Sequence, residues 1–350
     1  MALSNVVEVS IGRLPLMIVK SIASGKHKPI LTLGAPGIGK SDCVAQAATA
    51  IRQHVKNYGF QETILSMYDY TDIRFPFLNG ERMAFSYNPE FPLESNSDRI
   101  PPTGLWHIDE LTNVEPSIQK SILQLVLNGK LGNDQLLSGW SIVASGNRTQ
   151  DRTFSGLLSA ALANRFTILH VVPNLDDWVK WAYVNEVEPL VIAFLKYKPD
   201  QIHNFNADLF SQGEMAFPSP RAWATVSNLW KMGMDKGDRL AMICGTVGSA
   251  AGQGFESFAR VYEDLPDLDE ICATGKGRIP KDVAVLIAVS TALVARATQK
   301  NIDNILKYSD GLPAEYQKLL AVDLGRRDPM LVTSEAYASW AVRHEKALGR

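Results

Sequence analysis

Apolar and polar positions in the first half of the chain predict alternating strands and helices. Short apolar runs that suit buried strands occur at 29–33, 63–67, 105–108, 141–145 and 166–172. Apolar residues at helical spacing follow the first run, from Val44 to Val55, and the third run, from Ile118 to Val126. A shorter helix is expected from Leu157 to Leu162. This order predicts an α/β fold with a mostly parallel sheet that is covered by helices on both faces.

Two segments interrupt the alternation and are predicted to be inserts. Residues 75–102 are rich in Pro, Asn and Ser and contain a hairpin signal around Gly80. Residues 128–140 form a second hairpin-like segment around Gly132, directly after a helix that Pro116 begins and Asn128-Gly129 ends. Both inserts are therefore expected to project from the predicted sheet.

The pattern changes at Pro173, after which helical spacing dominates up to the C-terminus. Asp176 is suited to cap a helix that carries Trp178 and Trp181, and tryptophans at such spacing more often pack in a core than stack on bases. We predict three regions: a nucleotide-binding core at 1–173, an all-helical domain at 174–295, and a helical C-terminal extension at 296–350.

Composition agrees with two globular domains and argues against some partners. The chain has 350 residues, 46% of them hydrophobic, and it carries 35 Lys+Arg against 37 Asp+Glu. The absence of a basic excess argues against a nucleic-acid partner. Three widely spaced cysteines lack metal-ligand spacing and suggest reduced thiols in a cytoplasmic protein, and the early apolar run 14–19 is too short for a membrane span or a signal peptide.

A complete phosphate-binding loop motif follows the first predicted strand and precedes the first predicted helix. It has the pattern Gly34-x-x-x-x-Gly39-Lys40-Ser41. Glycines allow backbone N–H groups to wrap around phosphates at a helix N-terminus, Lys40 neutralises the β- and γ-phosphates, and the Ser41 hydroxyl ligates Mg²⁺. The expected cofactors are ATP and Mg²⁺, and the expected ATP-binding residues are Gly34, Ala35, Pro36, Gly37, Ile38, Gly39, Lys40, Ser41 and Asp42.

Two acids end the third predicted strand, where they would reach the same edge of the sheet as the phosphate-binding loop. Asp109 is the expected metal ligand, together with Ser41, and Glu110 is expected to orient and deprotonate the attacking water. An Asp-Glu pair after a strand is by itself more often a turn or a helix cap. The complete loop upstream favours the catalytic interpretation.

Further polar residues are candidates on the basis of their positions. Asn147 follows the fourth strand, where an amide can reach the γ-phosphate, although Asn is also a common turn residue. Arg165 lies just before the last strand, and Arg221 begins a helix in the second half. Ordinary surface roles fit both arginines when each is judged alone. Arg148 and Arg152 are rival candidates for the arginine roles, and His107 is more typical of a core or edge-strand residue than of a catalyst.

Taken in order, the segments GAPGIGKS, LWHIDELTN, ASGNR, ALANRF and FPSPRAW resemble the AAA+ ATPases of the MoxR-like branch. The resemblance implies a five-stranded P-loop core, a helical lid, and a ring of usually six subunits with ATP at the interfaces. It also implies catalytic roles for Asn147 as sensor 1, for Arg165 as an arginine finger acting on a neighbouring subunit, and for Arg221 as sensor 2.

The same resemblance assigns the two inserts to positions facing the pore or a client. One departure is that Asp72-Ile73-Arg74 is followed by Phe75, where related sequences often have Gly soon after such a triplet. The implied function is a chaperone-like motor that hydrolyses ATP and remodels a protein partner, in this family often one with a von Willebrand factor A-type domain.

Two alternatives from other classes stay open. The same core drives nucleic-acid motors and loaders, which a basic and aromatic insert would favour, but charges in and beside the insert at 75–102 are mixed. A nucleotide-gated binding module with little turnover is the other alternative. Intact Lys40, Asp109 and Glu110 argue against it.

Overall fold

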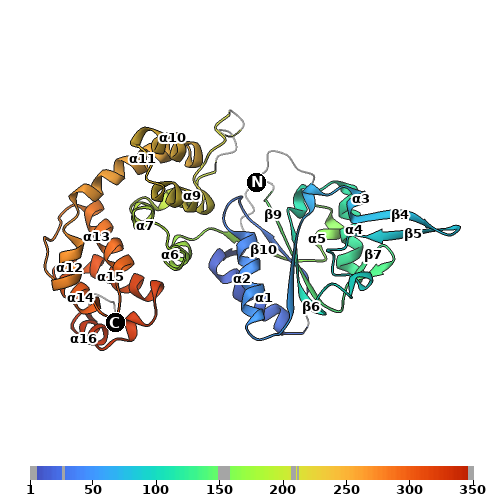
Figure 1. Cartoon of the computed structure of the whole chain (residues 1–350), viewed down its shortest axis with the longest axis horizontal. Coiled ribbons are helices and arrows are strands. Elements are labelled where there is room, and N and C mark those ends of the chain that lie inside the picture. The colour runs from blue at the N-terminus through green and yellow to red at the C-terminus, as the bar shows by residue number, and fades with distance from the viewer. Residues whose placement is uncertain (1–5, 26–27, 149–157, 206–209, 211–212, 346–350) are drawn as a thin grey trace. The chain divides into compact units, whose positions relative to one another are not determined.

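The computed structural model describes residues 6–25, 28–148, 158–205, 210 and 213–345 of the chain. The chain divides into two compact units, Met1–Pro173 and Asn174–Arg350. The first unit contains a parallel sheet with helices on both faces (Figure 1). The fold is therefore α/β.

Six parallel strands form the central sheet, in the order β1-β10-β2-β9-β6-β3. Their bounds are Glu8–Ser10 (β1), Ile30–Leu33 (β2), Tyr58–Ile64 (β3), Thr103–Asp109 (β6), Gly139–Gly146 (β9) and Thr167–Val172 (β10). The predicted number of five strands is wrong, because β1 pairs with β10 at the edge of the sheet. β1 has three residues, of which Val9 has the one large apolar side chain. Such a short strand gives no apolar run that could be recognised in the sequence.

Alternate residues of the central strands enter different hydrophobic cores. Ile30 packs with α1 (Leu14–Ala23) and α2 (Lys40–Arg52), whereas its neighbour Leu31 packs with α4 (Pro116–Asn128) and α5 (Ala160–Ala163). The period of two in a strand sends neighbouring side chains to opposite faces, so a continuous apolar run is what a strand buried on both sides requires.

The second predicted strand is the least accurate prediction in the sheet. It was expected at 63–67, but β3 begins at Tyr58, and Leu65–Met67 form a 3₁₀ helix instead. β3 lies at the edge and pairs only with β6. Its polar residues Gln61 and Glu62 are partly or fully exposed to solvent. Because they interrupt the apolar run, the residues before them were not predicted to belong to the strand.

The two inserts are built around hairpins. The first contains β4 (Arg74–Asn79) and β5 (Arg82–Tyr87), joined at Gly80 with a φ of 64°, and later a 3₁₀ helix at Glu94–Asn96. A short α3 (Tyr70–Ile73) precedes it. The second pairs β7 (Lys130–Leu131) with β8 (Asp134–Gln135). The β4–β5 hairpin leaves four large apolar side chains exposed: Phe75, Phe77, Leu78 and Met83.

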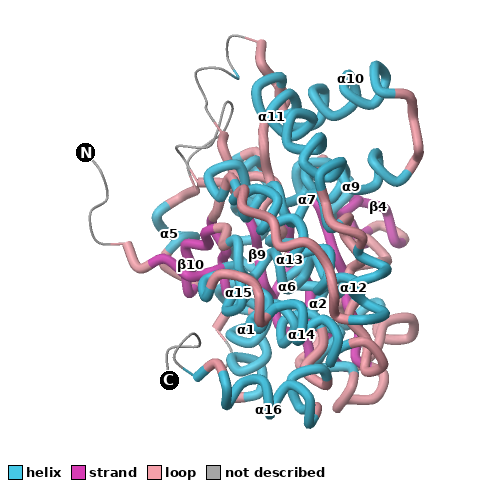
Figure 2. The backbone as a smooth tube through the Cα atoms, turned by 90° about the vertical axis from the view of Figure 1, so that its left-hand side faces the viewer, coloured by secondary structure: helices cyan, strands magenta, loops and turns pink. Residues whose placement is uncertain are grey.

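Regular structure in the described part of the second unit is entirely helical (Figure 2). One hydrophobic core extends from Trp178 to Trp340, and α13 is buried along nearly its whole length. The predicted subdivision at residue 295 stays a prediction. The α-helices are α6 (Leu175–Val184), α7 (Pro189–Tyr197), α9 (Pro220–Lys231), α10 (Lys236–Val247), α11 (Ser249–Ala259), α12 (Leu268–Thr274), α13 (Val283–Arg296), α14 (Ile302–Ser309), α15 (Ala314–Arg327) and α16 (Glu335–Arg343).

The early apolar run 14–19 lies inside α1 and contributes Leu14 and Ile18 to the core beside α2. Among the residues that the structure describes, none of the helices combines the length and the apolar character that crossing a membrane would require.

Candidate functional site

The glycine-rich loop joins β2 to α2 in a conformation that needs glycine. Gly37 and Gly39 have φ values of 75° and 96°, and Gly39 is the N-cap residue directly before α2. A Cβ on Gly34 would lie 2.6 Å from the carbonyl oxygen of Val171. The loop therefore holds its backbone at the N-terminus of a 13-residue helix, where a helix dipole attracts anions.

Lys40 places a buried cation inside this loop. Lys40 is 8% exposed. Its Nζ donates to the carbonyl oxygens of Gly34 at 3.0 Å and Ala35 at 2.9 Å. Nζ also donates to Oδ1 of Asn147 at 3.1 Å. Acceptors thus hold the ammonium at the place where the motif requires a phosphate-binding charge.

Ser41 and Asp109 meet although they come from different elements. Asp109 is the last residue of β6, and the Ser41 hydroxyl at the start of α2 donates to its Oδ2 at 2.6 Å. A hydroxyl and a carboxylate are the hard oxygen ligands that Mg²⁺ prefers. The residues present therefore fit the predicted metal ion.

Asp109 stays ionised in spite of its burial. Burial alone would raise the pKa of its carboxyl, but hydrogen bonds from Ser145 and Ser41 and the nearby His107 outweigh that effect and lower the pKa below its ordinary value. The backbone N–H of Glu110 also donates to Oδ1, at 2.8 Å. An ionised carboxylate is the form that can bind a metal ion.

Glu110 begins a 3₁₀ helix at Leu111–Asn113 and has a φ of 56°, an uncommon conformation for a residue other than glycine. Its carboxylate accepts a hydrogen bond from the hydroxyl of Ser66, which lies just after β3. The predicted base is thus held by a residue that sequence reasoning missed. Ser66 carries no recognisable motif signal.

Asn147 follows β9, the strand that lies between β2 and β6. Besides its contact with Lys40, its backbone N–H donates to Oγ1 of Thr112 at 3.0 Å. A Cβ on the preceding Gly146 would lie 2.5 Å from Thr112. The end of β9 therefore packs closely against Thr112, and this packing holds the Asn147 amide beside the glycine-rich loop.

The structure leaves the predicted roles of the arginines and of Asp42 untested. Arg165 is exposed after α5, and its guanidinium has no hydrogen bond or ion pair within the described part of the chain. Arg221 lies in the second unit, exposed in the first turn of α9, and Asp42 is exposed in the first turn of α2. Of the rival arginines, Arg148 follows Asn147 directly, and Arg152 lies outside the described residues.

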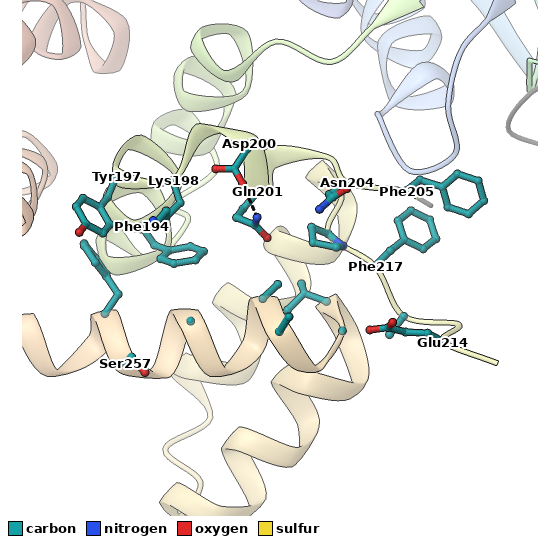
Figure 3. A pocket seen from close by; sticks show the side chains of 18 of the residues that line it. Phe194, Tyr197, Lys198, Asp200, Gln201, Asn204, Phe205, Glu214, Phe217 and Ser257 are labelled. Carbon is teal, nitrogen blue, oxygen red and sulfur yellow. Dashed lines mark hydrogen bonds between the residues drawn. The ribbon is translucent and has the colours of Figure 1, made fainter. Parts of the chain in front are cut away.

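The second unit contains a separate cavity of about 780 Å³ (Figure 3). Aromatic side chains from α7 and the following loop line one side of it, and small residues of α11 line another. No residue that the sequence predicted for the nucleotide site lines this cavity. Its aromatic lining residues include Phe194, Tyr197, Phe205, Phe217 and Phe258.

Comparisons of sequence give no relatives: no protein-family model matches the chain, and no curated protein does. Solved structures give matches of low similarity. NtrX from Brucella abortus in complex with ADP is 12% identical, with 99% of this chain and 70% of that chain covered and a TM-score of 0.40.

Two further structures resemble parts of the chain. A candidate ATPase from Cytophaga hutchinsonii is 15% identical, with 68% of this chain and 82% of that chain covered and a TM-score of 0.34. The closed-state reconstruction of Hsp104 with ATPγS and FITC-casein is 14% identical, with 50% of this chain and 36% of that chain covered and a TM-score of 0.35. At these identities and TM-scores, function has to be argued from the residues of the site.

Proposed function

We propose that this chain is an ATP-hydrolysing AAA+ motor of the MoxR-like branch. The observation that carries the proposal is the convergence of Lys40, Ser41, Asp109 and Asn147 from three elements at one glycine-rich loop. Each contributes a different function: a cation, two metal-ligand oxygens and an amide. A glycine-rich turn without a ligand would need none of these contacts.

The residues divide the proposed chemistry among them. The loop N–H groups and Lys40 bind the triphosphate, and Ser41 and Asp109 hold Mg²⁺, which supplies charge neutralisation at the phosphates. Glu110 takes the proton from the attacking water, and Asn147 orients the water and the terminal phosphate. Asp42 is assigned to the ATP site by its place in the first turn of α2, beside the loop.

A ring of subunits, with six expected, is the finer part of the proposal. Arg165 supports it, because an exposed guanidinium without a partner in the described chain can complete a neighbouring site. Arg221 is assigned as the sensor of the helical domain. The exposed apolar β4–β5 hairpin supports a protein client, since such patches mark interaction sites.

The test replaces the proposed base and a matched acid in the same loop. Glu110→Gln should bind ATP with nearly unchanged affinity and lose ATP turnover by about 100-fold or more, because general-base catalysis contributes roughly 10²–10⁴-fold. Glu115→Gln alters an exposed acid at the start of α4 and should keep the wild-type rate.

Wild-type turnover in Glu110→Gln would show that another group activates the water. Tight ATP binding without measurable turnover in the wild-type assembly would instead favour the nucleotide-gated binding module.

A further inference from the structure

A chain of hydrogen bonds leads from the surface of the sheet edge to the proposed metal ligand. On β3, Glu62 Oε1 lies 2.9 Å from His107 Nδ1, and its side chain is 42% exposed. The other ring nitrogen, Nε2, lies 3.1 Å from Oγ of Ser145, whose hydroxyl donates to Oδ1 of Asp109. His107 and Ser145 are completely buried. Three adjacent strands, β3, β6 and β9, supply the four residues.

The ionised carboxylate of Asp109 determines the direction in which the hydrogen bonds nearest to it are donated. Ionised Asp109 can only accept, so the Ser145 hydroxyl must donate to it. The Ser145 oxygen can then accept from Nε2–H of His107 and the Glu62 carboxylate from Nδ1–H, and both bonds form at once only when the ring carries a hydrogen on each nitrogen. Each link therefore orients the next one toward Asp109.

The two oxygens of Asp109 have separate partners as a result. Oδ1 accepts from Ser145 and from the backbone N–H of Glu110, whereas Oδ2 accepts from Ser41. The bonds to Oδ1 fix the rotation of the carboxylate and direct Oδ2 toward the predicted Mg²⁺ ligand on α2. Partners of this kind, one step removed from the metal, tune how tightly a site holds it.

We propose that Glu62, His107 and Ser145 are positioning residues that orient Asp109 for Mg²⁺ binding. This inference rests on the proposed MgATP site. Glu62 is the informative member, because its side-chain hydrogen bond among the described residues goes to His107 and not to Asp109, and its side chain lies partly in solvent. A change at Glu62 should therefore alter the response to Mg²⁺ while leaving the phosphate-binding loop itself unchanged.

The same side chains also suit a metal ion of their own, which is the rival interpretation. One ligand atom each from Glu62, His107 and Asp109 lie within 4.8 Å of one another. Both ring nitrogens of His107 and Oδ1 of Asp109 already have hydrogen-bond partners, however. The positioning role accounts for every one of these contacts without an additional ion.

The experiment measures binding of a fluorescent ADP analogue to the full chain during titration with Mg²⁺, and again in EDTA. Glu62→Ala should raise the half-saturating Mg²⁺ concentration by about tenfold and leave affinity in EDTA unchanged. Glu62→Gln keeps an acceptor for Nδ1–H and should restore most of the response. Glu94→Ala removes an exposed carboxylate from the insert and is the matched control.

The results separate failure of the inference from failure of the proposed site. If Asp109→Asn leaves the Mg²⁺ response unchanged, the proposed metal ligand is wrong. If Asp109→Asn abolishes the response while Glu62→Ala behaves like Glu94→Ala, only the positioning role is overturned. Zn²⁺ binding to the nucleotide-free wild type that disappears in Glu62→Ala would also overturn it, in favour of a separate metal site.

Discussion

Replacing Lys40 by Met should separate nucleotide binding from folding. Met has a similar length and keeps the apolar stem, so the change removes the charge and leaves the packing of a residue that is 8% exposed. The described oxygen acceptors of the ammonium include three: the carbonyls of Gly34 and Ala35 and the amide of Asn147. All three lie in or beside the proposed phosphate site.

The expected magnitudes follow from these contacts. A hydrogen bond to a charged group contributes about 1.5–3 kcal/mol, and phosphate oxygens would offer the ammonium at least one such bond. A loss of about 3 kcal/mol corresponds to an affinity roughly 100-fold weaker. In the free protein, removing a buried ammonium also removes its desolvation cost. The free energy of unfolding should therefore change by only about 1 kcal/mol.

The assay is fluorescence titration with an ATP analogue, combined with denaturant unfolding of the nucleotide-free protein. Lys56→Met, which alters an exposed lysine in the same unit, serves as the control and should change neither quantity. Affinity of Lys40→Met within threefold of wild type would refute the phosphate-binding role. A loss of stability equal to the loss of affinity would show that Lys40 acts on the fold instead.

Two further predictions concern the interface and the pH dependence of stability. Rings mixed from Glu110→Gln and Arg165→Ala subunits should recover ATPase activity that neither variant has alone, and absence of recovery in demonstrably mixed rings would contradict action across an interface. Among the described residues the buried Tyr58 hydroxyl has no hydrogen-bond partner, whereas that of Tyr308 donates to a carbonyl at 2.8 Å. Tyr58→Phe should therefore leave stability at pH 7 unchanged or higher, and Tyr308→Phe should lower it by about 1 kcal/mol in denaturant unfolding. Burial raises the pKa of both phenols from 10.0 to about 12, so ionisation of these phenols does not affect stability below pH 10 and lowers it as pH rises from 10 through 12. Each Phe variant should therefore lose less stability over that range.

The central strands could be predicted because their burial leaves a direct trace in the sequence. β2 and β9 lie inside the sheet, so apolar side chains are required on both faces, and their runs were recognised within a few residues of their ends. The glycine spacing of the loop is equally direct, since the conformation at Gly37 and Gly39 is one that few other residues adopt.

Edge strands and long-range hydrogen bonds left no such trace. β1 has one large apolar residue, and the polar pair Gln61-Glu62 interrupts the apolar residues of β3; both strands lie at the edges of the sheet. Ser145 and Asp109 are 36 positions apart, and Ser66 and Glu110 are 44 positions apart. Serine is common at strand ends and turns, so neither serine could be assigned a partner before the strand order was known. The polar His107 inside an apolar run was the one available signal.

The strand order explains why the two neighbouring acids have separate hydrogen-bond partners. β6 lies between β9 and β3, and a hydroxyl from each side reaches one acid: Ser145 on β9 holds Asp109, and Ser66 after β3 holds Glu110. Asp109 is therefore held directly from the interior strand β9, with Glu62 on the edge strand β3 further along the same hydrogen-bond chain, whereas Glu110 is held directly by a segment after β3. Because an edge segment has fewer neighbours to hold it, we expect the proposed base, Glu110, to be easier to reorient than the proposed metal ligand, Asp109.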